Sequence, residues 1–254
     1  MTKALKRFLV TSSLAFIHSS ALKRKAAAVS LTPEETHHLR DVLHLKKGSE
    51  CLLFDREGNE CTGRVESFQE DGSAQFQLLE PAVKSSEGVL KLSVAQAIPQ
   101  DRKMDDIVRK SAELGLLELI PLETERTIVR MSQDQFQKVS SRWERILTQA
   151  AKQSRVSRLP RVAPPASFKD LCSRFSSYDR VFILHPDSKA KPIREIEVDN
   201  SDHILLVIGP EGGFSDQELK LAQRAEVITM GHEIMRTDTA FVAAASFFKL
   251  MGER

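Results

Sequence analysis

The chain has 254 residues, of which 41% are hydrophobic and 28% are charged, so it can bury a core and is not a disordered chain. Its 37 basic and 35 acidic residues leave a formal net charge of +2, which excludes a histone-like arm and a polyacidic buffer. Cys51, Cys61 and Cys172 form no C-x-x-C pair, so we expect reduced thiols in a cytoplasmic protein rather than a disulfide framework or a zinc site. No run approaches the roughly 20 apolar residues of a membrane span.

The first third of the chain predicts a short helix and then a small β-barrel. The helix starts at Thr32-Pro33-Glu34-Glu35. Short apolar runs at 51–54, 61–65 and 74–79 follow, separated by turn signals, and this spacing is typical of a small barrel. Residues 81–88 are expected to be a linker. We therefore place a first domain at residues 1–82 and a second at residues 88–254.

After the linker the chain alternates between strands and helices. Strands are expected at 90–98, 116–122, 181–184, 204–208 and 227–230. Helices are expected at 101–114, from Ser132, from Ser215 and at 237–251. The later strands are uninterrupted apolar runs, as in strands buried on both faces, which predicts an α/β domain with a mostly parallel sheet.

Two of the expected strand ends carry glycine-bearing loops. The first is Ile208-Gly209-Pro210-Glu211-Gly212-Gly213-Phe214-Ser215, and the second runs from Met230 to Ala240. Parallel sheets bind ligands at the carboxyl ends of their strands, where glycine lets the backbone approach a ligand closely. Neither loop has the dinucleotide or Walker spacing, so ordinary NAD or ATP binding is disfavoured. The alternative is a tight strand-to-helix turn that binds nothing.

Basic residues gather in two segments of this nearly neutral chain. Residues 1–33 hold six basic residues and no acidic one, and residues 141–161 hold six basic residues and one acidic residue. Such clusters are typical of proteins that contact RNA phosphates, and a solvated helix face is the alternative.

These motifs together resemble the RsmE family of 16S ribosomal RNA uridine-N3 methyltransferases, in the SPOUT superfamily. The resemblance covers nearly the whole length, and its most specific element is the G-P-E-G-G strand end followed by the M-R-T-D-T loop. The chain departs from the family pattern at Lys152, Val156, His232 and Glu233. Two alternatives stay open: a SPOUT enzyme for another RNA site (a ribose 2′-hydroxyl in tRNA or 23S rRNA), and a non-catalytic RNA-binding protein.

The resemblance implies an α/β, SPOUT-type trefoil-knotted parallel-sheet domain with a small N-terminal PUA-like β-barrel domain. It also implies S-adenosyl-L-methionine as cofactor, a homodimer, no membrane, and 16S rRNA, within the 30S subunit, as partner. The residues it assigns to cofactor binding are Leu184, His185, Ile208, Gly209, Pro210, Glu211, Gly212, Gly213, Met230, Gly231, Ile234, Met235 and Arg236.

Methyl transfer to uracil N3 requires that the N3 proton leaves, so an arginine near the base is expected to stabilise the developing anion. The candidates for this catalytic role are Arg158, Arg102 and Arg236. The candidates for RNA binding are Lys6, Arg7, Arg24, Arg40, Arg142, Arg155 and Arg158. No metal is expected, because the spacing of His37, His38 and His185 fits no metal motif.

Overall fold

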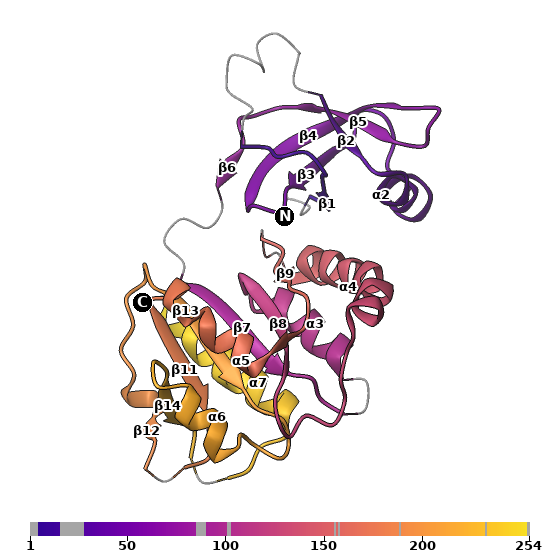
Figure 1. Cartoon of the computed structure of the whole chain (residues 1–254). Helices are drawn as coiled ribbons and strands as arrows, with labels where there is room; N and C mark the ends of the chain where they lie inside the picture. The colour runs from indigo at the N-terminus through magenta and orange to yellow at the C-terminus, as the bar shows by residue number, and fades with distance from the viewer. Residues whose placement is uncertain are drawn as a thin grey trace. The chain divides into compact units, whose positions relative to one another are not determined.

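A computed structural model describes residues 5–15, 28–84, 90–100, 103–154, 156, 158–187, 189–231 and 233–252 (Figure 1). The chain divides into two compact units, Met1–Glu87 with Ala151–Leu159, and Gly88–Ala150 with Pro160–Arg254. The segment Ala151–Leu159, which the expected boundaries place in the second domain, therefore packs with the first unit.

The first unit is built on a curled sheet of short strands (Figure 1). The strands are β1 Arg7–Leu9, β2 Ala28–Leu31, β3 Glu50–Phe54, β4 Asn59–Phe68, β5 Ala74–Leu78 and β6 Val83–Lys84. Their order is β1-β3-β4-β5-β2, with β6 paired to β4. Helix α2, Pro33–His37, begins at the expected place, with Thr32 as its N-cap, and continues into a π-helical turn at His38–Val42.

The core of this unit follows from alternation along the strands. In β5 every second side chain is buried, and Phe76 in its middle packs with Phe8 and Leu53. The predicted linker is wrong at its start, because Val83 and Lys84 pair with β4 and so extend this sheet. Both residues of β6 are exposed. A strand that buries no side chain shows no alternation of apolar and polar residues, so the sequence does not predict it.

The second unit is a parallel sheet with helices on both faces. Its strands are β7 Lys91–Ala97, β8 Glu118–Glu123, β9 Arg161–Val162, β10 Ala166–Ser167, β11 Arg180–Leu184, β12 Lys191–Pro192, β13 His203–Ile208 and β14 Glu226–Thr229. The order is β10-β8-β7-β13-β11-β14-β12, with β9 paired to β8, and every pairing is parallel. The predicted α/β class is confirmed.

The helices of this unit are α3 Met104–Glu113, α4 Gln133–Ser154, α5 Phe168–Ser173, α6 Asp216–Leu221 and α7 Thr237–Met251. Helix α4 crosses the boundary between the units, because its last four residues belong to the first. Helices α5 and α6 pack on the sheet face that carries Ile183, whereas Phe248 of α7 stacks on Phe182 of the opposite face at 5.2 Å between ring centroids. Side chains alternate between the faces of a strand, so β11 is buried on both sides.

Local signals fix where these helices begin and end. Ser215 and Glu218 form the predicted capping box, and Ser132 and Gln135 exchange the same pair of hydrogen bonds. Gly115 ends α3 in the left-handed conformation, with φ of 68°.

Among the described residues, no helix is both long and apolar enough to cross a membrane. The trefoil knot stays a prediction.

Candidate functional site

The carboxyl ends of β11, β13 and β14 surround a cavity of about 290 Å³. These ends are neighbours, because Leu184 of β11 pairs with Ile208 of β13 on one side and with Ile228 of β14 on the other. The lining residues are Arg126, Leu184, His185, Pro186, Ile208, Gly209, Pro210, Glu211, Gly212, Gly213, Phe214, Thr229, Met230, Gly231, Glu233, Ile234, Met235, Thr237 and Ala240. The two glycine-bearing loops predicted from the sequence thus face a single cavity.

The loop after β13 is shaped by its glycines. A Cβ atom on Gly209 would lie 2.9 Å from the ring of Phe214, so only glycine lets this ring fold back on the strand end. Gly213 has φ of 69°, and its amide donates to the Pro210 carbonyl at 2.9 Å. This tight turn leaves the Gly212–Gly213 backbone as part of the cavity wall.

The loop after β14 is held by a side chain at the strand end. The Thr229 hydroxyl donates to the Gly231 carbonyl at 3.0 Å and accepts from the Gly231 amide at 3.2 Å. Gly231 itself has φ of 130°, which other residues rarely adopt. Beyond it Ile234 lines the cavity with a side chain that is 86% exposed. An apolar side chain exposed at a cavity rim suits contact with a ligand or with another macromolecule.

His185 directly follows β11, the third strand that ends at the cavity, and brings a polar side chain to this strand end. Its backbone amide donates to the Ile228 carbonyl at 2.9 Å, which ties β11 to β14 at the cavity floor. Its side-chain Nδ1 is buried and has no hydrogen-bond partner among the described residues. Buried polar atoms in folded proteins are nearly always satisfied, so this nitrogen points to a group that the cavity receives.

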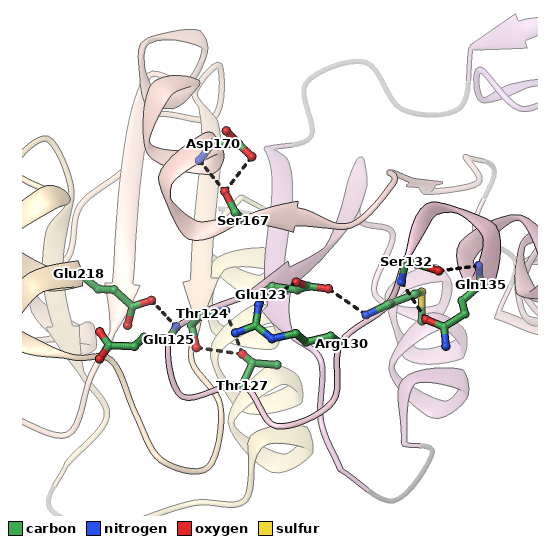
Figure 2. A network of polar contacts seen from close by, with 11 residues as sticks. Glu123, Thr124, Glu125, Thr127, Arg130, Ser132, Gln135, Ser167, Asp170 and Glu218 are labelled. Carbon is green, nitrogen blue, oxygen red and sulfur yellow. Dashed lines mark hydrogen bonds and ion pairs between the residues drawn. The ribbon is translucent and has the colours of Figure 1, made fainter.

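Arg126 and Glu233 are the two charged lining residues that the sequence analysis left out of the predicted set, and Arg126 bridges two loops. Arg126 lies in the loop after β8, and its Nη1 donates to the Gly212 carbonyl at 2.8 Å. The adjacent amide of Glu125 donates to Oε1 of Glu218 at 2.8 Å, and Figure 2 shows this contact between the loop and α6. The sequence pattern of the β8 loop does not predict that this loop lies at the cavity. In the sheet β7 separates β8 from β13, so the position of the loop follows from strand order and not from a local pattern.

The first turn of α7 is fixed by charge. Lys103 Nζ and Asp238 Oδ1 lie 3.2 Å apart, which joins the start of α3 to the start of α7. Burial works to raise the pKa of Asp238, but the hydrogen bond from Lys103, a backbone hydrogen bond and the positive charges of Lys103 and Lys110 together hold the pKa of that carboxyl below its usual value. Thr237 and Ala240 of the same turn line the cavity, so this ion pair sets the position of its wall.

The residues predicted to bind the cofactor gather at the cavity, with one exception. All of them line it except Arg236, which is the exposed N-cap residue of α7. Besides Arg126, the sequence analysis left out Pro186, Phe214, Thr229, Glu233, Thr237 and Ala240 from this set. Most of these follow or precede a predicted residue directly, so chain adjacency is the signal that finds them.

The predicted RNA-binding residues differ from one another in their exposure and in their acidic partners. Lys6 is exposed. Arg7 is not available to RNA, because its side chain is only 7% exposed and forms an ion pair with Glu60. Arg40 and Arg142 are exposed, and each has an acidic neighbour: Arg40 pairs with Asp41, and Arg142 donates to Asp105 at 2.8 Å. The charge count alone could not separate the paired arginines from the others.

Among the catalytic candidates, Arg158 is half-buried and belongs to the first unit, where its backbone forms an isolated bridge with Glu57. Arg24, Arg102 and Arg155 lie outside the described residues.

Within the part of the chain that the structure describes, no group of three or more histidine, cysteine or acidic residues could hold a metal ion. The three cysteines are free thiols, and burial raises the pKa of Cys51 to about 11.

The chain combines a parallel α/β domain that has a cavity at three strand ends with a small β domain, and family models identify these parts as those of an RNA methyltransferase. The family model described as RNA methyltransferase domain matches residues 86–249, and that described as RNA methyltransferase PUA domain matches residues 31–79. The chain is 32% identical over 219 residues to ribosomal RNA small subunit methyltransferase E of Synechocystis sp., covering 84% of this chain and 70% of that protein. The chain belongs to this methyltransferase family.

Two further comparisons agree with this assignment. The protein of the same name from Bacillus subtilis is 28% identical over 230 residues, which is 87% of this chain and 90% of that one. A crystal structure of ribosomal RNA small subunit methyltransferase E from Neisseria gonorrhoeae, bound to S-adenosyl methionine, superposes with a TM-score of 0.79 at 26% identity. That superposition covers 98% of both chains.

Proposed function

We propose that this protein transfers the methyl group of S-adenosyl-L-methionine to N3 of a uridine in 16S ribosomal RNA. The observation that carries the proposal is the cavity at the ends of β11, β13 and β14, which is formed by the two glycine-bearing loops. Membership of the small-subunit methyltransferase family supports 16S rRNA as the substrate. Family membership is also our reason to propose that the reaction takes place in the cytoplasm and that the protein forms a homodimer.

The chemistry of the cavity wall fits this cofactor. Leu184, Ile208 and Met230 offer apolar contacts to a nucleoside, while the glycine backbone offers hydrogen-bonding groups without side chains in the way. The buried Nδ1 of His185, which has no hydrogen-bond partner in the described part of the chain, offers one further polar contact. The residues that would hold the cofactor are therefore the predicted ones, with Arg236 left out.

The bound cofactor supplies a methyl group on a sulfonium, which is electrophilic. Uracil N3 carries a proton and attacks only once that proton has left, so the protein must favour the anionic base. The N3–carbon bond then forms while the sulfur–carbon bond breaks. We assign the stabilisation of the anion to Arg158, because a guanidinium group is a cation that donates hydrogen bonds. Arg102 and Arg236 are the further candidates for the same role.

RNA binding would rest on the basic residues that remain accessible. Lys6, Arg40 and Arg142 are exposed, and Arg7 leaves the proposed set because its side chain is only 7% exposed. Neutralisation of phosphates by lysine and arginine releases counterions, so binding is expected to weaken steeply with salt. The assembled 30S subunit is the proposed form of the substrate.

Calorimetry with S-adenosyl-L-methionine tests the cofactor part of the proposal. A folded sample is expected to bind one cofactor for each chain. Absence of binding would exclude the methyltransferase function and favour a non-catalytic RNA-binding protein. Arg158→Ala then tests the chemical step, because it should bind the cofactor normally and transfer the methyl group slowly.

A further inference from the structure

The loop after β8 reaches across the end of a neighbouring strand to hold the loop after β13. The guanidinium of Arg126 donates to the Gly212 carbonyl at 2.8 Å. The stem of Arg126 also packs on this glycine, since a Cβ atom on Gly212 would lie 3.3 Å from the Cβ of Arg126. Strand β7 separates β8 from β13, so these contacts join two loops that sheet pairing does not bring together.

Glu218 makes a second connection between the same two loops. Its Oε1 accepts from the Glu125 amide at 2.8 Å, and its Oε2 accepts from the Ser215 amide at 2.9 Å. Glu218 as a whole is only 8% exposed, so both hydrogen bonds are shielded from water. Figure 2 shows Glu218 reaching from α6 to Glu125.

The β8 loop is itself braced, so it can act as a fixed support. The Thr124 amide donates to the Thr127 hydroxyl at 2.9 Å, and both side chains are buried (Figure 2). Glu123 accepts from the Met131 amide at 2.8 Å, which closes the far end of the loop. Arg126 therefore projects from a segment whose two ends are both held.

We infer that Arg126 is a positioning residue that holds the Gly212 peptide in the conformation that receives the cofactor. A Gly-Gly pair has more conformational freedom than any other, and this freedom would be lost on binding. The hydrogen bond from Arg126 restricts this freedom, and preorganisation of this kind strengthens binding. The inference deepens the proposed function and rests on it.

The experiment compares Arg126→Met with Arg109→Met in the binding of S-adenosyl-L-methionine and 5′-methylthioadenosine. Arg109 is the matched control, because it is an exposed arginine that pairs with Asp106 on α3, outside the cavity. Arg126→Met is expected to weaken both ligands by about tenfold, since it removes one charge-assisted hydrogen bond. Arg126→Lys should recover part of the loss, and Arg109→Met should bind both ligands as the wild type does.

Two outcomes would overturn the inference. Unchanged binding by Arg126→Met would show that the Gly212 contact has no effect on the cavity. Weaker binding of S-adenosyl-L-methionine alone would show that Arg126 contacts its carboxylate directly, because 5′-methylthioadenosine lacks that group. In a methyl-transfer assay, positioning predicts a raised KM for the cofactor with kcat nearly unchanged. A wild type that binds neither ligand contradicts the proposed function itself, which keeps the two failures distinct.

Discussion

Lys152 at the end of α4 donates to Oε1 of Glu35 in α2 at 2.6 Å, inside the first compact unit. The two side chains are only 16% and 15% exposed, and the ammonium group also lies 5.5 Å from the centroid of the Phe8 ring. Lys152 is one of the positions at which the sequence analysis expects a departure from the family pattern. The expected departure coincides with an ion pair that joins residues 151–159 to the sheet of the first unit.

Reversal of this ion pair should restore the stability that single reversals remove. Lys152→Glu places two carboxylates together in a half-buried site and should lower the free energy of unfolding by roughly 2–4 kcal/mol. The double variant Lys152→Glu with Glu35→Lys should recover most of the loss in a urea titration. A double variant no more stable than Lys152→Glu would contradict the pairing.

The left-handed conformation of Gly213 should matter for cofactor binding beyond its effect on stability. Gly213 has φ of 69°, and no atom of the described residues lies within 4 Å of a Cβ position, so alanine there is opposed by backbone strain of about 1 kcal/mol and not by a clash with them. Gly48 has φ of 90° and equally open surroundings in the other unit, which makes Gly48→Ala a matched control. Calorimetry should show weaker cofactor binding for Gly213→Ala only. Equal affinities for the two variants would contradict a role for this turn in the cavity.

The long periodic elements of the fold could be predicted from the sequence, and the contacts between loops could not. Runs such as 204–208 and the amphipathic face of 101–114 predict a strand and a helix because burial imposes a period on the sequence. The strand ends also predict most of the cavity, since parallel strands present their carboxyl ends at one edge. Arg126 was missed because it reaches Gly212 across β7, and strand order is not written in local periodicity. Arg7 was included among the candidates for RNA binding because a charge count does not show that Arg7 forms an ion pair with Glu60.

His203 should make the protein less stable in mild acid. Burial, and secondarily Lys91, lower the pKa of His203 below its ordinary value of 6.5, and its ring nitrogen lies 2.9 Å from the Ser93 hydroxyl. Well above pH 6.5 the imidazole is neutral in both the folded and the unfolded state, and the free energy of unfolding does not depend on its protonation. As the pH falls below 6.5 the unfolded chain gains its proton first, so the free energy of unfolding decreases until the folded pKa is passed.

Unfolding of the wild type and His203→Gln at pH 7.5 and pH 5 checks this. The wild type should lose more stability between the two values than the variant does. His38, whose pKa is lowered mainly by burial, leaves a residual pH dependence in both proteins. Equal losses in the two proteins would contradict the assignment to His203.

Arg158 should act on catalysis without acting on the cofactor. Its side chain is half-buried in the first unit, whereas the cavity is formed by residues of the second. Arg158→Ala is expected to slow methyl transfer by about 10²-fold or more, as for loss of one electrostatic stabiliser, with the cofactor affinity within twofold of the wild type. Arg145→Ala serves as the control, because Arg145 is an exposed arginine of the same basic segment that carries no proposed role. Similar rates for the two variants would remove Arg158 from the mechanism.

The central claim is methylation of uridine N3 in 16S rRNA, and nucleoside mapping of the product tests it most directly. Free 16S rRNA and 30S particles that lack the modification would each be incubated with the protein and labelled S-adenosyl-L-methionine, digested, and separated by chromatography with mass detection. We predict label in N3-methyluridine at a single position, with the 30S particle as the better substrate. Label in a ribose 2′-O-methyl nucleoside, or no incorporation by protein that binds the cofactor, would contradict the claim.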